Sequence, residues 1–260
     1  DVPGAISEFK TIMKEFKLRK DIYRILFRGK GLEFESYREF SPDDDAADID
    51  WKASSRSQKI LVKQYREERD LKIMFILDVG NNSVFGSTPK LKCEFTAELV
   101  AAFSKIIMEE GDRVGMFLFS NDVKHFITPK NGRKNFEILV DLITNAETYG
   151  GVTDIDKGLD FAMTYLNKSI NAVIFVSDFL RITSESEKRL TLLSSLFETI
   201  FIRVRDPLDV TLPNVEGEIV LNNPGSGEQI IINPKVARAA YEKNAREQAK
   251  AVEEIIKKTD

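Results

Sequence analysis

Three oxygen-bearing side chains, far apart in the sequence, are spaced in a way that could bring them together around a hard metal ion. Asp78 lies at the end of the apolar run LKIMFILDV, Asp178 lies at the end of the run NAVIFVSDF, and Thr153 follows a Gly-Gly pair. If the two runs are parallel strands of one sheet, their carboxyl ends meet at the edge where such sheets bind ligands. Two carboxylates and a hydroxyl suit Mg²⁺ or Mn²⁺, which keep several of their waters.

The same residues also have a purely structural interpretation. Asp78 could cap the turn that follows its strand, and Thr153 could cap the helix that follows its loop, because short oxygen-bearing side chains accept hydrogen bonds from free backbone N–H groups. The residues alone leave both interpretations open.

A second acidic cluster lies nearer the amino terminus. The segment 43–50 contains five aspartates, which could hold a cation or could form a solvated turn that pairs with Arg38, Lys52 and Arg56. The chain has no GxxxxGK[ST] loop for phosphate and no GxSxG elbow for a nucleophilic serine.

Single residues of other reactive types favour structural roles. His125 is the only histidine and Cys93 the only cysteine, which excludes a His-rich zinc site and an intrachain disulfide. We expect His125 to be structural in an edge strand, Cys93 to be a buried thiol on a helix face, and Trp51 to fill a gap in the core.

The elements that position the rim residues follow from hydrophobic periodicity. Short apolar runs alternate with amphipathic segments between residues 71 and 206. This alternation predicts an α/β fold with a doubly wound, mostly parallel, Rossmann-type sheet and helices on both faces. The predicted strands cover 71–79, 113–120, 123–129, 171–179 and 198–206, and the predicted helices cover 91–110, 133–143, 154–166 and 189–197.

Two flanking regions complete the chain. Residues 1–70 are predicted to form an extension with a helix over 6–27, broken by glycines at 29–31, and a strand over 60–65. Residues 207–260 are predicted to form a hairpin over 218–233 and a long helix over 234–258. We expect the extension to pack on the 71–206 core and all three regions to form one structural unit.

Composition limits the classes of partner. A net charge of −4 argues against a general nucleic-acid binder, and no apolar run is long enough to span a bilayer. We therefore expect no membrane contact by this chain. The single cysteine suits a reducing compartment, so we expect a cytoplasmic location. The chain begins with Asp1 instead of Met, so we expect a processed or shortened product, in which an upstream segment could tether it to the inner face of a membrane.

Several motifs resemble those of the domain-of-unknown-function 58 family. They are Gly31-Leu-Glu-Phe34, Asp48-Ile-Asp-Trp51, Gly111-Asp-Arg-Val-Gly115 and Arg205-Asp-Pro207. The resemblance runs from about Gly29 to the C-terminus, and the Ile-Asp-Trp segment is its most specific part. The central region is similar to von Willebrand factor A domains.

The resemblance implies a degenerate metal site. Domains of that superfamily hold a divalent cation with D-x-S-x-S, a threonine from a later loop and an aspartate after a later strand. These positions correspond here to Asp78, Asn82, Thr153 and Asp178, with Gly80 and Asn82 at the two serine positions. Gly80 offers no side-chain oxygen, and Asn82 offers a neutral amide oxygen. We therefore expect binding of Mg²⁺ or Mn²⁺ to be weak or absent.

The resemblance also implies a non-enzymatic adaptor whose partner is a MoxR-type AAA+ ATPase, in assembly or chaperone-like work. The rim loops near Asn81-Asn82, Thr153 and Phe179-Leu180 would then dock the partner. Two alternatives remain at this point: a scaffold with a dead metal site, and a metal-dependent phosphoester hydrolase using the rim carboxylates or the 43–50 cluster. The oligomeric state is not predicted.

Overall fold

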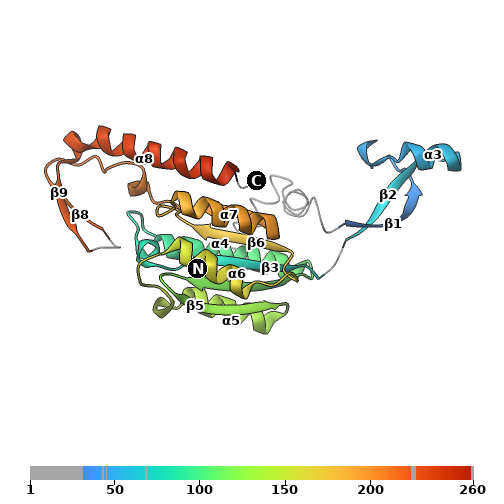
Figure 1. Cartoon of the computed structure of the whole chain (residues 1–260), viewed down its shortest axis with the longest axis horizontal. Coiled ribbons are helices and arrows are strands. Elements are labelled where there is room, and N and C mark those ends of the chain that lie inside the picture. Colours follow the sequence, from blue (N-terminus) through green and yellow to red (C-terminus); the bar gives the residue numbers. More distant parts are fainter. Residues whose placement is uncertain (1–31, 43, 45, 68–69, 224–226, 259–260) are drawn as a thin grey trace.

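The centre of the molecule is a five-stranded sheet with the order β5-β4-β3-β6-β7 (Figure 1). The structure is a computed structural model, and it describes residues 32–42, 44, 46–67, 70–223 and 227–258. The helix predicted over 6–27 and the glycines at 29–31 lie outside the described residues. The strands are β3 (Lys72–Asp78), β4 (Arg113–Phe119), β5 (Val123–Lys130), β6 (Ala172–Ser177) and β7 (Glu198–Arg203).

The topology of this sheet is doubly wound, as predicted. All neighbouring strands pair in parallel except β4 and β5, which are antiparallel. Counted from β3 in chain order, the strands lie in the order 3-2-1-4-5, so the direction of winding reverses between β3 and β6. The carboxyl ends of β3 and β6 therefore form the edge at which this class of sheet binds ligands.

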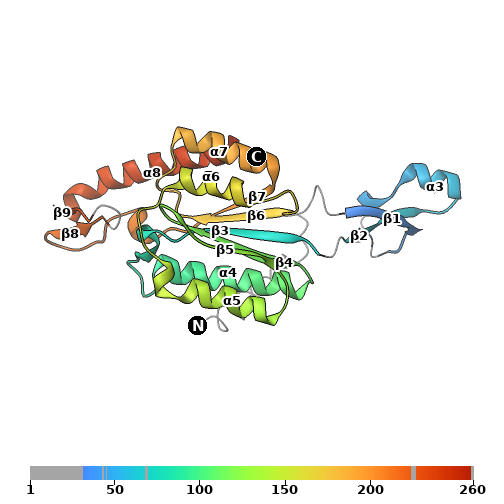
Figure 2. The same ribbon diagram turned by 60° about the horizontal axis from the view of Figure 1, so that its bottom comes forward.

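Helices cover both faces of the sheet, which confirms the predicted fold class. Side chains alternate along a strand, so Phe75 packs into the core on one face and Met74 into the core on the other. The helices are α4 (Lys92–Glu109), α5 (Arg133–Thr144), α6 (Ile155–Tyr165), α7 (Ser184–Leu196) and α8 (Pro234–Lys258). Figure 2 shows α4 and α5 below the sheet and α6, α7 and α8 above it.

Helix α7 begins five residues earlier than predicted, at Ser184 instead of Arg189. A reciprocal capping box fixes this start: Ser186 N–H donates to Thr183 Oγ1 at 3.3 Å, and Thr183 N–H donates to Ser186 Oγ at 3.0 Å. The first turn contains no apolar residue, so hydrophobic periodicity did not reveal it.

The described part of the N-terminal extension is a small unit of its own. Strand β1 (Leu32–Glu39) pairs antiparallel with β2 (Leu61–Glu67), and α3 (Trp51–Ser57) lies between them in the chain. Figures 1 and 2 draw this unit apart from the central sheet. The predicted packing of residues 1–70 on the core stays a prediction, because residues 1–31 and 68–69 lie outside the described part.

The predicted role of Trp51 as a core filler is wrong. Trp51 is the first residue of α3 and its side chain is 68% exposed. The adjoining Asp50 is the N-cap, and its carboxylate accepts from the N–H groups of Lys52 and Ala53, both at 3.0 Å. The Ile-Asp-Trp segment therefore starts a helix, and its aspartate explains why.

Other single-residue predictions can be compared directly with the structure. Cys93 is buried on α4, as predicted, and His125 is exposed on β5, which is an edge strand. Asp44 forms an ion pair with Arg38, in which Nη1 donates to Oδ2 at 2.6 Å. This pairing agrees with the interpretation of the acidic segment as a turn, although Asp43 and Asp45 lie outside the described residues.

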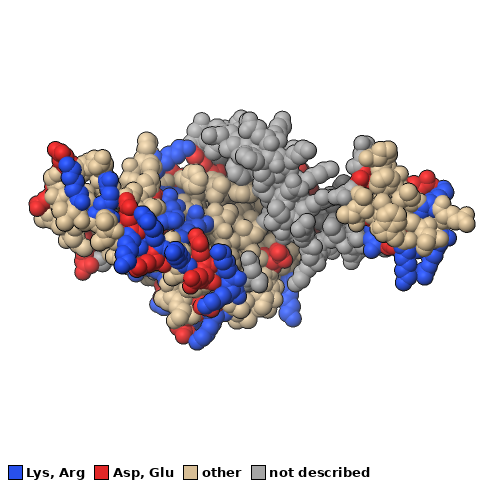
Figure 3. Space-filling view, turned by 90° about the horizontal axis from the view of Figure 1, so that it is seen from above, with Lys and Arg blue, Asp and Glu red and all other residues tan. Residues whose placement is uncertain are grey.

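The C-terminal region forms the predicted hairpin and helix. Strands β8 (Ile219–Asn222) and β9 (Gln229–Ile232) are antiparallel, and α8 has the predicted bounds. Val252 of α8 is 1% exposed in the core beside α7. Figure 3 shows basic and acidic side chains intermingled over α8. Among the described residues, no helix has the length and apolar character required to cross a bilayer.

Candidate functional site

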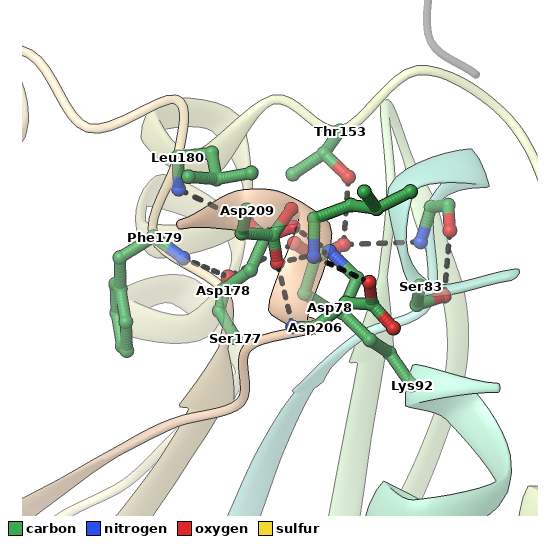
Figure 4. Close-up of polar contacts among 12 residues, drawn as sticks. Asp78, Ser83, Lys92, Thr153, Ser177, Asp178, Phe179, Leu180, Asp206 and Asp209 are labelled. Atoms are coloured by element: carbon green, nitrogen blue, oxygen red, sulfur yellow. Dashed lines mark hydrogen bonds and ion pairs between the residues drawn. The ribbon is translucent and has the colours of Figure 1, made fainter. Parts of the chain in front are cut away.

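The structure brings Asp78, Thr153 and Asp178 to one end of the central sheet (Figure 4). Asp78 ends β3, and Asp178 directly follows β6, the strand that pairs with β3. Thr153 lies in the loop before α6, and its hydroxyl donates to Asp78 Oδ1 at 2.7 Å. All three side chains are buried, with exposed fractions of 6–8%.

Hydrogen bonds from three directions hold the Asp78 carboxylate. Besides Thr153, the N–H of Gly80 donates to Oδ1 and the hydroxyl of Ser177 donates to Oδ2, both at 3.0 Å. Burial raises the pKa of Asp78 to about 6, and the nearby charge of Asp178 adds to the rise. The structural interpretation is therefore half right: Asp78 caps its turn, but Asp154 and not Thr153 caps α6.

Asp178 is held by a buried cation from the same chain. The Lys92 ammonium donates to Asp178 Oδ2 at 2.9 Å and to Asp209 Oδ2 at 3.2 Å, and the lysine is 5% exposed. Burial alone would lower the pKa of Lys92, but the two carboxylates outweigh it and hold the pKa above its ordinary value. The other Asp178 oxygen, Oδ1, accepts from the N–H of Leu180 at 3.0 Å.

The turn after Asp178 has a strained backbone. Phe179 has a φ of 55°, in the left-handed region that bulky residues rarely adopt. Its ring is fully buried, 5.2 Å from the ring of Phe175 between centroids, and its N–H donates to Ser177 Oγ at 3.1 Å. Ring packing and hydrogen bonds thus offset the strain and fix the position of the Asp178 carboxylate.

A short 3₁₀ turn, η4 (Pro207–Asp209), closes the site from the side of β7. Asp206 accepts from the N–H of Ser87 at 2.7 Å and from its hydroxyl at 2.5 Å, which joins η4 to the loop before α4. The hydroxyl of Tyr241 donates to the carbonyl of Leu208. Helix α8 therefore supports the turn that carries Asp209.

The side chains at this end enclose very little space. A cavity of about 10 Å³ is lined by Asp78, Ser83, Lys92 and Asp178 together with Thr96, Val176, Ser177 and Val204. A cavity of this size holds about one water molecule. Ser83 of η2 (Asn81–Val84) lines it, whereas Asn82, the predicted amide ligand, does not.

In this arrangement the side chains do not fit a divalent cation. The Thr153 hydroxyl donates to Asp78, and Asp178 Oδ2 faces the Lys92 ammonium. A Cβ at Gly80 would lie 2.0 Å from Thr153 Oγ1, so a serine ligand at position 80 has no room. Within the part of the chain that the structure describes, no three His, Cys, Asp or Glu side chains are grouped so that they could hold a metal ion.

Placing a serine at position 80 is expected to destabilise the protein. Gly80→Ser must displace Thr153 and break its bond to Asp78, at an expected cost of about 1–3 kcal/mol in unfolding free energy. Urea unfolding measures this loss. In the Gly80→Ser background, Thr153→Ala should cost less than it does alone, because the clash is then relieved. If Gly80→Ser is as stable as the wild type, the close approach of Gly80 to Thr153 Oγ1 is contradicted.

Sequence reasoning missed three residues of this site: Lys92, Ser177 and Asp209. Ser177 could have been found, since it directly precedes Asp178 at the end of the same strand. Lys92 gave no signal, because a lysine in the first turn of a helix usually points into solvent. Its partner Asp209 lies 117 residues away in the sequence.

The fold and the site define a class of protein: a doubly wound α/β domain with paired carboxylates at the reversal point of its sheet. Comparison with known families makes this specific. The chain belongs to the family described as "Protein of unknown function DUF58", whose model matches residues 36–251. The expected membership is confirmed, and the mostly parallel sheet with helices on both faces agrees with the α/β fold that the resemblance implied.

Curated relatives and solved structures are similar to this chain at low identity. The uncharacterized proteins Rv1480 of Mycobacterium tuberculosis and Mb1516 of Mycobacterium bovis are each 26% identical over 223 residues, covering 83% of this chain and 69% of theirs. The conserved hypothetical protein BatB of Bacteroides thetaiotaomicron is 13% identical, with a TM-score of 0.44, over 73% of this chain and 98% of its own. An aerotolerance-related membrane protein of Bacteroides fragilis is 16% identical, with a TM-score of 0.43, over 72% of this chain and 99% of its own.

Proposed function

We propose that this domain is a non-enzymatic adaptor that binds a protein partner through the loops at the carboxyl end of its sheet. The observation that carries the proposal is that the buried polar groups there are used to fix the loops. Asp78 holds the loops that contain Gly80 and Thr153, and Asp178 holds α4 through Lys92. A cavity with room for about one water leaves no space for a substrate beside these carboxylates.

Main-chain hydrogen bonds join two of these loops into one surface. The N–H of Asn81 donates to the carbonyl of Gly151, and the N–H of Gly150 donates to the carbonyl of Val79, both at 2.8 Å. Loops that are fixed to each other in this way lose little conformational entropy when a partner binds. A preformed surface is what an adaptor requires.

The joined loops carry exposed apolar side chains. Val84 is 46% exposed and Val152 is 42% exposed, whereas Phe179, which we expected to contact a partner, is fully buried. We therefore place the docking surface on Val84 and Val152 with the backbone between them. The partner we propose is the MoxR-type AAA+ ATPase that the family resemblance implies.

Aspartate at either valine should abolish binding while leaving the domain folded. Val84→Asp and Val152→Asp each place a charge on the docking surface, and an unpaired charge buried in an interface is expected to weaken binding at least 100-fold. Pull-down and titration with the purified ATPase measure this effect, and circular dichroism confirms folding. Asp78→Ala is less suitable, because this buried side chain also holds the loops in place.

Leu196→Asp is the matched control. Leu196 is 49% exposed and ends α7 just before the amino end of β7, at the opposite end of the sheet. This variant should bind the ATPase like the wild type. Unchanged binding by Val84→Asp and Val152→Asp together would refute the docking surface, and a wild-type protein that does not bind the ATPase would refute the partner.

A further inference from the structure

We infer that the ammonium group of Lys92 is the resident cation of the rim site and excludes divalent metal ions from it. The site would then keep its shape without any bound metal. Lys92 is the first residue of α4 and directly follows the N-cap residue Leu91, so the helix fixes its position. The inference is independent of the proposed adaptor function.

The Lys92 ammonium contacts two carboxylates and an aromatic ring. Two of its partners are the carboxylates of Asp178 and Asp209, which come from the segments after β6 and β7. A third is the ring of Phe85, whose centroid lies 5.9 Å from Nζ, within the range of a cation–π contact. Charged hydrogen bonds and an aromatic face together replace the water that a lysine normally binds.

The charge of the site requires a cation at this place. The carboxylates of Asp78 and Asp178 line one small cavity, and Asp209 adjoins it through Lys92. Arg203 donates to the backbone carbonyl of Asp178 at 3.2 Å, but this contact leaves the carboxylate to Lys92. Without the ammonium, the carboxylates of Asp178 and Asp209 would lose their buried ion-pair partner, which is strongly unfavourable in a low-dielectric interior.

Lys92 also occupies the approach that a metal ion would need. Asp178 Oδ2 points at the ammonium 2.9 Å away, and about 10 Å³ of free space leaves no room for a hydrated cation beside it. A divalent ion could enter only after the lysine left. Replacing Lys92 by a small neutral residue should therefore open the carboxylate of Asp178 to Mg²⁺ or Mn²⁺.

This gain of metal binding provides the experiment. The wild type and Lys92→Ser are compared by calorimetric titration and by thermal unfolding, with Mg²⁺, with Mn²⁺ and with a chelator. The wild type should give no binding heat and an unchanged Tm. Lys92→Ser should have a lower Tm, should bind the ions, and should gain about 5–10 °C in Tm at an ion concentration 100 times its Kd.

A half-exposed lysine of the same helix serves as the control. Lys105 is 42% exposed and lies 3.8 Å from Glu109, with its ammonium over the ring of Phe136, so Lys105→Ser should bind neither ion, like the wild type. If Lys92→Ser folds only when refolded with Mn²⁺, the inference is supported. Three results would overturn it: metal binding by the wild type, a folded Lys92→Ser that ignores both ions, or a Lys92→Ser that fails to fold with and without Mn²⁺.

Discussion

Replacing Asp178 by alanine is expected to lower the free energy of unfolding by about 3–5 kcal/mol at pH 7. The side chains of Lys92 and Asp178 are 5% and 6% exposed, so alanine leaves a buried ammonium with Asp209 as its one remaining ion-pair partner among the described residues. The variant also loses the hydrogen bond from the N–H of Leu180, which holds the turn at Phe179 in its strained conformation. Equilibrium unfolding in urea measures the change.

Asp160→Ala is the comparison that isolates burial from charge. Asp160 pairs with Arg189 at 2.8 Å, a distance close to that of the buried pair, but the two side chains are 52% and 30% exposed. Solvent screens such a pair, so its loss should cost less than about 1 kcal/mol. Equal losses in the two variants would mean that the Lys92 pair contributes no more than a surface ion pair.

The sequence was sufficient to place the rim aspartates because strand patterns determine where strands end. Buried parallel strands are continuous apolar runs, so the first polar residue after each run marks the carboxyl edge of the sheet. Asp78 and Asp178 follow this rule directly. Thr153 was placed less directly, through the Gly-Gly pair, and both glycines do adopt the positive φ angles that such a loop requires.

The contacts within the site could not be predicted from the sequence, because they depend on which residues the fold brings close together. Gly80 was interpreted as a lost ligand, but its missing Cβ leaves the space that Thr153 Oγ1 occupies. Lys92 has the same sequence signature as a solvated lysine, and only the fold places Asp178 and Asp209 around it. The exposure of Trp51 was missed for a similar reason: helix α3 belongs to a small unit in which Val62 is the only buried apolar side chain among the described ones.

Asp78→Asn, in contrast to Asp178→Ala, is expected to make the protein more stable at pH 8, by about 3 kcal/mol. The asparagine can keep all three contacts, with Oδ1 accepting from Gly80 and Thr153 and the amide donating to Ser177. What the variant removes is the cost of keeping a buried carboxylate charged next to Asp178. Urea unfolding of both proteins between pH 4 and pH 8 measures the difference.

The sign of this effect follows from the raised pKa of Asp78. Burial raises it from 3.8 to about 6, so between these values the folded state binds a proton that the unfolded state has released. Stability from this group is therefore lost as the pH rises from about 4 to about 6, and above pH 6 the loss is complete. The two proteins should be equally stable near pH 4 and should diverge through this window.

Asp206→Asn should lower the stability of the protein, and so it controls for general effects of replacing an aspartate by asparagine. Burial alone would raise the pKa of Asp206, but hydrogen bonds from Ser87 and Leu208 outweigh it and lower the pKa. Its carboxylate is therefore more favourable in the folded state than in the unfolded state at neutral pH, and the amide should destabilise the protein there. If Asp78→Asn also destabilises at pH 8, the charge on Asp78 is compensated in the folded protein, and its three hydrogen bonds outweigh burial as those of Asp206 do.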